Sequence, residues 1–332
     1  MDGSRPLAMD RALGALIGVA LGDALGMPTQ TMSRAEIALA YGRIDGFVAP
    51  MPDHPVSFGL QAAMVTDDTE QTLLLARRLI ADRGGFDEAA WVADLLRWET
   101  GIRARGLRDL LGPSSKAALE ALTAGMDPAA TGVLGTTNGA AMRIAPVGIA
   151  TAPDVALLVA RVEAVSRVTH ATGEALAAAS AVAMVISQGV AGATFENSLP
   201  LAMAAARAGN LRGARVGEAD MAGRIALALS VAGEGEAALA ARIGTSVQCH
   251  HSVAAAFGVV RLAKGDPWRA ALIAANIGDD TDTIGAIACA MAGACAGLGV
   301  FPKDRVEQVI AVNRLELRPI AEGLLALRGA QG

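Results

Sequence analysis

Apolar residues recur along this chain with the spacing of helices rather than of strands. In the segment 67–83, DDTEQTLLLARRLIADR, they return every three or four positions and so lie on one face of an α-helix. No stretch of useful length alternates between apolar and polar residues, as a half-buried strand would, and no motif repeats with a period of about 20–50 residues. The pattern predicts an all-α protein that folds as a single domain over residues 1–332.

The predicted helices share this apolar spacing and are separated by glycine, proline or short polar stretches. They cover residues 10–26, 67–83, 87–101, 112–125, 154–168, 173–190, 196–208, 217–230, 235–248, 250–264, 267–275, 283–298 and 303–328. Two glycine-containing stretches between them, 33–63 and 131–143, are predicted to be loops. A loop as long as 33–63 is uncommon in a compact domain and often serves as a lid or binding segment.

The first predicted helix carries glycines at every fourth position. Gly14, Gly18, Gly22 and Gly26 fall roughly on one face of a helix over 10–26. Because these positions have no side chain, we expect a second helix to approach this face closely.

The composition supports a large buried core. Hydrophobic residues make up 53% of the chain and charged residues 18%, which excludes a disordered protein. Aromatic residues make up only 3%, a further sign of closely packed helices rather than strands. The net charge is −5 and no long basic run is present, so we do not expect a nucleic-acid partner.

The cysteines and the apolar runs indicate where the protein resides. Cys249, Cys289 and Cys295 are too scattered for a disulfide framework or a Cys-x-x-Cys zinc site, and we expect a reduced, cytoplasmic location. Two apolar runs, 174–193 and 284–301, approach the length of a membrane span, but they are rich in Ala and Gly and lack flanking Trp or Tyr. We interpret both as core helices and expect a soluble, unprocessed chain with no membrane partner.

Two short acidic segments are the strongest candidates for chemistry. TDDTE at 66–70 and DTDT at 280–283 each combine paired carboxylates with threonine hydroxyls near the start of a predicted helix. Either segment alone is explained by a helix cap whose acidic residues complement the helix dipole. Two such segments together favour a site for Mg²⁺, Mn²⁺ or Ca²⁺, because these hard cations prefer carboxylate and hydroxyl oxygens. Bound cations would also offset the repulsion between crowded carboxylates, roughly 4 kcal/mol for a pair about 4 Å apart.

Other polar residues allow two interpretations. Asp23 interrupts an apolar helix and either caps a neighbouring loop or serves the site. The segment 135–148, GTTNGAAMRIAPVG, either presents backbone N–H groups to a phosphate or ribose or forms an ordinary turn. His170 lies at a helix boundary and contacts either backbone or substrate, whereas His250 and His251 are interpreted as packing or surface residues. The absence of a G-x-S-x-G elbow excludes serine hydrolases of that type.

Five segments occur in an order that is informative as a set. They are LGDALGMP at 21–28, TDDTEQTLLLAR at 66–77, TNGAAMRIAPVG at 137–148, SRVTHATGEA at 166–175 and GDDTDTIGAIACAMAGA at 278–294. Together they resemble the ADP-ribosylglycohydrolase family, the ADP-ribosyl-acceptor hydrolases. The resemblance implies a compact multi-helix bundle with a binuclear Mg²⁺ or Mn²⁺ centre at helix N-termini. It also implies a glycosidase that hydrolyses a ribosyl C1 bond to nitrogen or oxygen, with removal of ADP-ribose from a modified acceptor as the leading expectation.

The same resemblance assigns roles to residues of this sequence. The implied metal ligands are Thr66, Asp67, Asp68, Asp280, Asp282 and Thr283, and the implied substrate residues are Gln30, Gly112, Ser114, Ser115, Asn138, Gly139, Met142 and His170. Asp67, Asp68 and Asp280 are the candidates for the catalytic carboxylate that accepts a proton from water. The loop 45–63 would lie over the metals.

Two positions depart from the family pattern and keep other functions open. Gln30 replaces a glutamate that is common in the family, which removes a charge and a possible base, and Asp279 stands where glycine is frequent. These differences favour, as an alternative, an N-glycosidase that acts on a small nucleoside or ribosyl metabolite. A non-catalytic binding protein on the same fold is the third hypothesis, and retention of the whole set of oxygen ligands argues against it.

Overall fold

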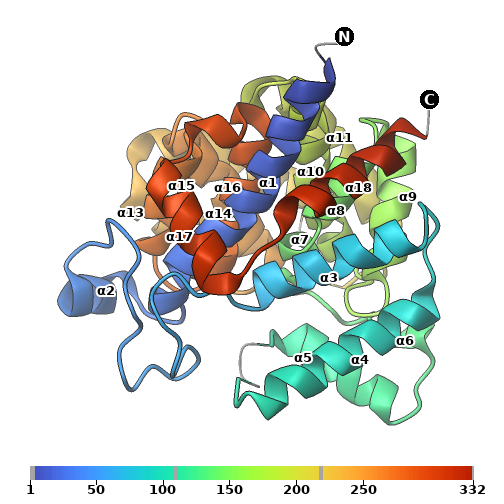
Figure 1. Cartoon of the computed structure of the whole chain (residues 1–332), viewed down its shortest axis with the longest axis horizontal. Coiled ribbons are helices and arrows are strands. Elements are labelled where there is room, and N and C mark those ends of the chain that lie inside the picture. The colour runs from blue at the N-terminus through green and yellow to red at the C-terminus, as the bar shows by residue number, and fades with distance from the viewer. Residues whose placement is uncertain (1–3, 108–110, 217–219, 331–332) are drawn as a thin grey trace.

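The computed structural model describes residues 4–107, 111–216 and 220–330, and every regular element within these ranges is a helix (Figure 1). The α-helices in chain order are α1 (Ser4–Gly26), α2 (Arg34–Tyr41), α3 (Asp67–Ala81), α4 (Glu88–Ala104), α5 (Pro113–Thr123), α6 (Pro128–Thr131), α7 (Gly139–Met142), α8 (Ala145–Ala150), α9 (Val155–Ser166), α10 (Gly173–Val190), α11 (Phe195–Asn210), α12 (Met221–Val231), α13 (Glu236–Ile243), α14 (Cys249–Leu262), α15 (Pro267–Ala275), α16 (Thr281–Ala296), α17 (Lys303–Asn313) and α18 (Leu317–Gly329). Short 3₁₀ turns cover Met27–Thr29, Ala232–Glu234 and Leu298–Val300. The prediction of an all-α fold is confirmed.

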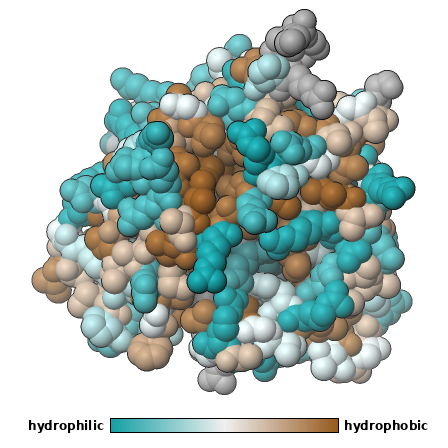
Figure 2. Space-filling model, in the orientation of Figure 1, coloured by the Kyte–Doolittle hydropathy of each residue, from teal (hydrophilic) through white to brown (hydrophobic). Residues whose placement is uncertain are grey.

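The centre of the fold is built by α1, α10 and α16, whose apolar side chains are mostly buried. Two segments, Pro6–Thr29 and Gly173–Val190, are long and apolar enough to cross a membrane by length and composition. However, 100% and 94% of their apolar windows are buried inside the structure, which supports their interpretation as core helices. Hydrophilic side chains cover much of the face shown in Figure 2, with apolar patches between them.

The glycines of α1 lie against α16 at backbone contact distance. A Cβ atom added at Gly18 would lie 2.2 Å from the carbonyl oxygen of Cys289, and one added at Gly22 would lie 2.1 Å from that of Gly285. Real Cβ atoms essentially never approach another atom within 3.0 Å, so only glycine allows this packing. The expected close approach of a second helix is confirmed.

Gly22→Ala should therefore lower the free energy of unfolding by about 3 kcal/mol or more, because α1 and α16 must separate to admit the methyl group. Gly101→Ala is the matched control, since Gly101 lies at an exposed position of α4 where an added Cβ meets no atom within 4 Å. That change should be neutral or stabilising by roughly 0.5–1 kcal/mol. Urea denaturation measures both, and equal stabilities would show that these glycines do not limit the α1–α16 contact.

Two predicted helices continue past residues at which a helix ends in the structure. The segment 303–328 forms two helices, because Arg314 takes a left-handed conformation with φ of 52° between α17 and α18. The helix predicted over 235–248 ends at Ile243, where Gly244 has a φ of 85°. In both cases the helix ends at a residue with positive φ, which an α-helix cannot include.

Two predicted loops contain helices. The stretch 33–63 contains α2, which Ser33 opens with a capping box. The stretch 131–143 contains the single turn of α7, and α8 follows it without having been predicted. The helix predicted over 217–230 is observed as α12, and the predicted residues 217–219 lie outside the described residues.

The two acidic segments meet at one end of α1. The first forms the start of α3 and the second forms the start of α16. Asp23 of α1 accepts hydrogen bonds from Thr66, and a Cβ added at Gly26 would lie 2.4 Å from the carbonyl oxygen of Thr281. The close packing of α1 on α16 thus fixes the place where both acidic segments lie.

Candidate active site

Four carboxylates gather at the starts of α3 and α16. Asp67 and Asp68 belong to α3, whereas Asp280 and Asp282 belong to the cap and first turn of α16, and their exposed fractions are 5%, 1%, 9% and 3%. The two helix starts are in contact, since the Thr283 hydroxyl lies 3.4 Å from Oδ2 of Asp68. The convergence on which the predicted site depends is therefore present in the fold.

Asp23 belongs to the frame of this site. Its carboxylate oxygens accept hydrogen bonds of 2.5–3.1 Å from the backbone N–H groups and hydroxyls of Thr66 and Thr69. The structure thus supports the structural interpretation of Asp23. The 2.8 Å bond from the Thr66 hydroxyl uses the only hydrogen on that oxygen. Its lone pairs are left for another group, such as a cation.

Burial makes the charged forms of the clustered carboxylates costly. It raises the pKa of Asp67, Asp68 and Asp282 well above 3.8, and neighbouring carboxylates raise it further. The pKa of Asp280 is raised to about 7, chiefly by burial, although a hydrogen bond from Asn138 opposes the shift. In addition, Oδ1 of Asp68 is buried without a hydrogen-bond partner among the described residues. None of these four carboxylates forms an ion pair with a described residue, so the cluster lacks a directly paired positive charge.

The oxygen atoms of the cluster fit hard divalent cations. The implied ligands, Thr66, Asp67, Asp68, Asp280, Asp282 and Thr283, supply carboxylates and hydroxyls, which are the donors that Mg²⁺ and Mn²⁺ prefer. When only His, Cys, Asp and Glu are counted, the described ranges contain no group of three or more that could hold a metal. An ion would therefore need the hydroxyl oxygens of Thr66 and Thr283 in addition to the carboxylates.

A buried arginine that is not among the predicted site residues supports the cluster. Arg143 donates a 2.7 Å hydrogen bond to Oε1 of Gln71, and Gln71 donates a 3.1 Å bond to Oδ2 of Asp67. The guanidinium carbon lies 5.6 Å from the ring centre of Trp91. Burial lowers the pKa of Arg143 to about 10, and the charge of Asp67 opposes this shift. Arg143 therefore stays charged at neutral pH and holds Asp67 in place through Gln71.

The same arginine is linked to His170 through Thr169. Arg143 donates a 2.5 Å hydrogen bond to Oγ1 of Thr169, and that oxygen lies 2.8 Å from Nδ1 of His170. Nε2 of His170 lies within hydrogen-bond distance of the Thr137 hydroxyl, at 3.1 Å. Burial, followed by the charge of Arg143, lowers the pKa of His170 well below 6.5. His170 is thus a neutral residue within a hydrogen-bond chain.

A cavity of about 140 Å³ opens beside the carboxylate cluster. Six predicted substrate residues line it, namely Gln30, Gly112, Ser115, Asn138, Gly139 and Met142, together with Asp67, Asp280, Asp282 and Thr283. Thr31, Val56, Leu111, Pro113 and Val247 complete the lining and were not predicted. The structure therefore brings most of the predicted substrate residues to the predicted ligands.

Two predicted substrate residues lie outside this lining. Ser114 accepts a 3.4 Å hydrogen bond from the backbone of Thr137. His170 is fully buried behind Gly139, where an added Cβ would lie 2.7 Å from the His170 ring. Both residues support the cavity wall in this structure, and direct contact with a substrate stays a prediction.

Asn138 orients a candidate catalytic carboxylate. Its side-chain amide donates to Oδ2 of Asp280 at 2.5 Å and to the Ser252 hydroxyl at 2.9 Å. The backbone N–H of Asp280 donates to the carbonyl of Thr245 at 3.0 Å. A residue predicted to contact substrate therefore also positions Asp280.

The loop 45–63 is tied to the site through Gln30. The Gln30 amide donates to the Ser57 hydroxyl at 2.8 Å, and that hydroxyl donates to the carbonyl of Met27 at 2.8 Å. Nδ1 of His54 accepts from the backbone of Ser57, so its Nε2–H donates to the Gln30 carbonyl at 2.9 Å. The same loop supplies one residue of the cavity lining. Its position over bound metals stays a prediction.

Asp279 lies outside the cavity lining. It has a left-handed φ of 65°, and its backbone exchanges 2.7 Å hydrogen bonds with Thr31 and Met32. Its side chain borders a neighbouring surface depression, although its charge contributes to the raised pKa of Asp280. Of the two departures from the family pattern, only Gln30 reaches the cavity itself.

Comparison with known proteins shows similarity over nearly the whole chain. A family model described as ADP-ribosylglycohydrolase matches residues 4–332. The uncharacterized protein YegU of Escherichia coli (strain K12) is 33% identical over 326 residues, which cover 96% of this chain and 97% of that protein. The ADP-ribosylarginine hydrolase Tri1 of Pseudomonas putida (strain GB-1) is 29% identical over 315 residues, covering 91% of this chain and 75% of that protein. A solved structure, described as an ADP-ribosylglycohydrolase-related protein complex, matches with a TM-score of 0.68 at 28% identity, covering 98% of this chain and 99% of that chain.

Proposed function

Because this chain belongs to the ADP-ribosylglycohydrolase family, we propose that it is a metal-dependent glycosidase that removes ADP-ribose from a modified acceptor. The Tri1 relative is named an ADP-ribosylarginine hydrolase, which supports an ADP-ribosyl substrate. The observation that carries the proposal is the convergence of buried carboxylates from α3 and α16 beside a cavity lined by predicted substrate residues.

The metal ligands in this proposal come from both helix starts. Thr66, Asp67, Asp68, Asp280, Asp282 and Thr283 would hold two Mg²⁺ or Mn²⁺ ions. Bound ions of this kind neutralise carboxylate charge and polarise a water molecule or a substrate hydroxyl. The buried, unpartnered Oδ1 of Asp68 supports this assignment, because it is an oxygen without a donor among the described residues.

The candidate catalytic carboxylates differ in their access to the cavity. Asp67 and Asp280 line it, whereas Asp68 does not, which favours the first two as proton acceptors. Each is held by an amide, since Gln71 donates to Asp67 and Asn138 donates to Asp280. Held in this way, either carboxylate is positioned to accept a proton from the attacking water. Their charge also favours an oxocarbenium-like transition state at the ribosyl C1.

The cavity suits one sugar ring. Its volume of about 140 Å³ is close to the roughly 150 Å³ of an engineered cavity that binds benzene. The adenosine diphosphate group would then extend beyond it. The N-terminus of α5, which begins after Gly112 and includes Ser115, borders the cavity and presents backbone N–H groups suited to a phosphate.

A panel of hydrolysis assays tests the proposed function. With Mn²⁺ or Mg²⁺, the protein should release ADP-ribose from ADP-ribosylated arginine or serine, and EDTA should stop the release. Cleavage of free nucleosides alone would instead support the N-glycosidase alternative, which the missing charge at Gln30 favours. Binding of Mn²⁺ without hydrolysis of any compound would support a non-catalytic protein.

Gln30→Glu should strengthen Mn²⁺ binding by about tenfold or more, because it places a further negative charge beside the carboxylate cluster. It also removes the N–H that Gln30 donates to Ser57. Ser57→Ala is the matched control, since it breaks the same hydrogen bond without adding charge. Isothermal titration with Mn²⁺ compares the two variants, and equal affinities would contradict an electrostatic role for position 30.

A further inference from the structure

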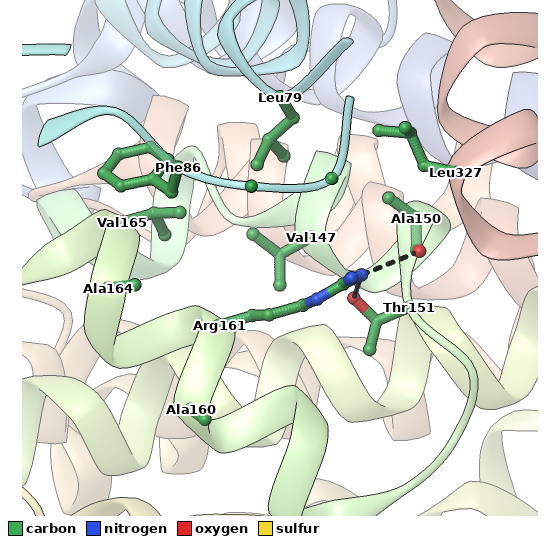
Figure 3. A pocket seen from close by; sticks show the side chains of 12 residues that line it. Leu79, Phe86, Val147, Ala150, Thr151, Ala160, Arg161, Ala164, Val165 and Leu327 are labelled. Atoms are coloured by element: carbon green, nitrogen blue, oxygen red, sulfur yellow. Dashed lines mark hydrogen bonds between the residues drawn. The ribbon is translucent and has the colours of Figure 1, made fainter. Parts of the chain in front are cut away.

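A second cavity lies apart from the carboxylate cluster. It has a volume of about 230 Å³ and is lined by the C-terminal end of α3, the loop that follows it, α8, α9 and α18 (Figure 3). Leu79 in its wall and Asp67 in the candidate active site lie at opposite ends of α3. At about 1.5 Å per residue, the helix separates them by roughly 18 Å. The cavity is therefore a separate site.

Apolar side chains form most of the wall of this cavity. Leu79 and Phe86 face it from α3 and the following loop, Val147 from α8, Val165 from α9 and Leu327 from α18 (Figure 3). A concave apolar lining of this kind favours the hydrocarbon part of a ligand over water. The volume exceeds the roughly 150 Å³ of an engineered cavity that holds benzene, so a ring and one substituent would fit.

One charged side chain enters the cavity. Arg161 extends from α9 toward the C-terminal end of α8, where its Nη1 donates to the carbonyl of Ala150 and the hydroxyl of Thr151, each at 3.1 Å (Figure 3). Its Nη2 faces the loop after α3, since a Cβ added at Gly84 would lie 3.9 Å from it. Burial lowers the pKa of Arg161, and no carboxylate among the described residues counteracts that shift.

Arg328, which also bonds to Thr151, forms hydrogen bonds through both ends of its guanidinium group. Its two terminal nitrogens both donate to backbone carbonyls, those of Thr151 and Ser187 among them. Arg161 differs, because only its Nη1 donates to a described residue. A guanidinium has five N–H donors in a planar fork, and the edge formed by Nε and Nη2 matches the two oxygens of a carboxylate.

The geometry points to a binding site for a small monocarboxylate with a compact apolar body, such as an aromatic or branched-chain acid. Its carboxylate would pair with the Nε–Nη2 edge of Arg161, and its apolar body would lie against Leu79 and Phe86. A phosphate ester fits less well, because it brings a higher charge and three oxygens to a cavity whose described lining contains one cationic side chain. The assignment does not rest on the proposed hydrolase function.

Benzoate and isovalerate are suitable probes, with benzamide and isovaleramide as their uncharged counterparts. Isothermal titration in EDTA prevents the carboxylates from binding through a metal ion. Each acid should bind saturably with one site per chain, and at least about tenfold more tightly than its amide. Equal affinities for acid and amide, or no saturable binding of either acid, would overturn the proposal.

Two variants locate the binding in this cavity. Arg161→Met should reduce the affinity for each acid to that of its amide, whereas Arg207→Met at an exposed position of α11 should change neither. Ala164→Leu should block acid and amide alike, because Ala164 lines the cavity and the larger side chain would fill it. Unchanged benzoate binding in both cavity variants, with melting curves showing that they fold, would place the acid elsewhere and overturn the assignment.

Discussion

Asp282→Asn should abolish hydrolysis and, at the same time, raise the thermal stability of the metal-free protein. Burial and neighbouring carboxylates raise the pKa of Asp282 well above 3.8 in the folded protein. Such a group contributes stability below its unfolded pKa, and that contribution is lost as the pH rises through the folded pKa. At neutral pH and above, Asp282 of the folded wild-type protein is therefore either charged in a buried position or protonated at a cost in free energy. The neutral amide of the Asp282→Asn variant avoids both.

Differential scanning calorimetry in EDTA measures this effect. At about pH 8 the melting temperature of Asp282→Asn should exceed that of the wild type by about 2 °C or more, and the gap should shrink as the pH is lowered. Adding Mn²⁺ should reverse the order, because a ligand stabilises only a folded state that binds it. Asp304→Asn is the control, since that side chain is 73% exposed on α17 and should change neither result. An equal Mn²⁺-dependent rise in wild type and Asp282→Asn would contradict the assignment of Asp282 as a ligand.

This expected gain in stability bears on the non-catalytic hypothesis. Asp67, Asp68, Asp280 and Asp282 are all nearly inaccessible to solvent, and the charge of Asp280 raises the pKa of each of the other three. A fold that used these positions only for packing would be more stable with neutral side chains there. Residues that weaken the metal-free fold are characteristic of functional sites.

The sequence is most informative where a local signal marks the structure. Glycine spacing on α1 and acidic residues at the starts of α3 and α16 predict both the close helix pair and the candidate site. The break at Arg314 carries no such signal, because arginine seldom adopts a left-handed conformation and the surrounding fold imposes it. The helix α2 is marked only by a capping box at Ser33, within the proline- and glycine-rich stretch 33–63.

Most of the residue roles that the sequence does not determine depend on contacts between distant segments. Asp23 admits two interpretations, and only its bonds to Thr66 and Thr69 decide between them. Arg143 interrupts an apolar run just as Asp23 does, so the rule that a lone charge in such a run needs a partner would have marked it. The partner of Arg143, Gln71, lies on α3, so only the folded structure shows that Arg143 supports the site.

Arg143→Met should lower the free energy of unfolding of the metal-free protein by about 3 kcal/mol or more. Gln71 and Thr169 would each lose a buried donor, and Asp67 would lose the buried positive charge of Arg143. Because Gln71 positions Asp67, turnover should also fall, with kcat reduced more than KM is changed. Urea unfolding in EDTA and steady-state kinetics measure the two effects.

The titration of His170 separates the charge of Arg143 from its packing. The guanidinium lowers the pKa of His170 in addition to burial, so that pKa should rise toward 6.5 in Arg143→Met. Arg143→Lys retains the charge and should keep the pKa of His170 low, although it loses the planar fork that reaches both Gln71 and Thr169. NMR titration of the His170 ring in the three proteins tests this. An unchanged pKa in Arg143→Met would mean that burial alone keeps His170 neutral and that the charge of Arg143 has no electrostatic effect at this part of the site.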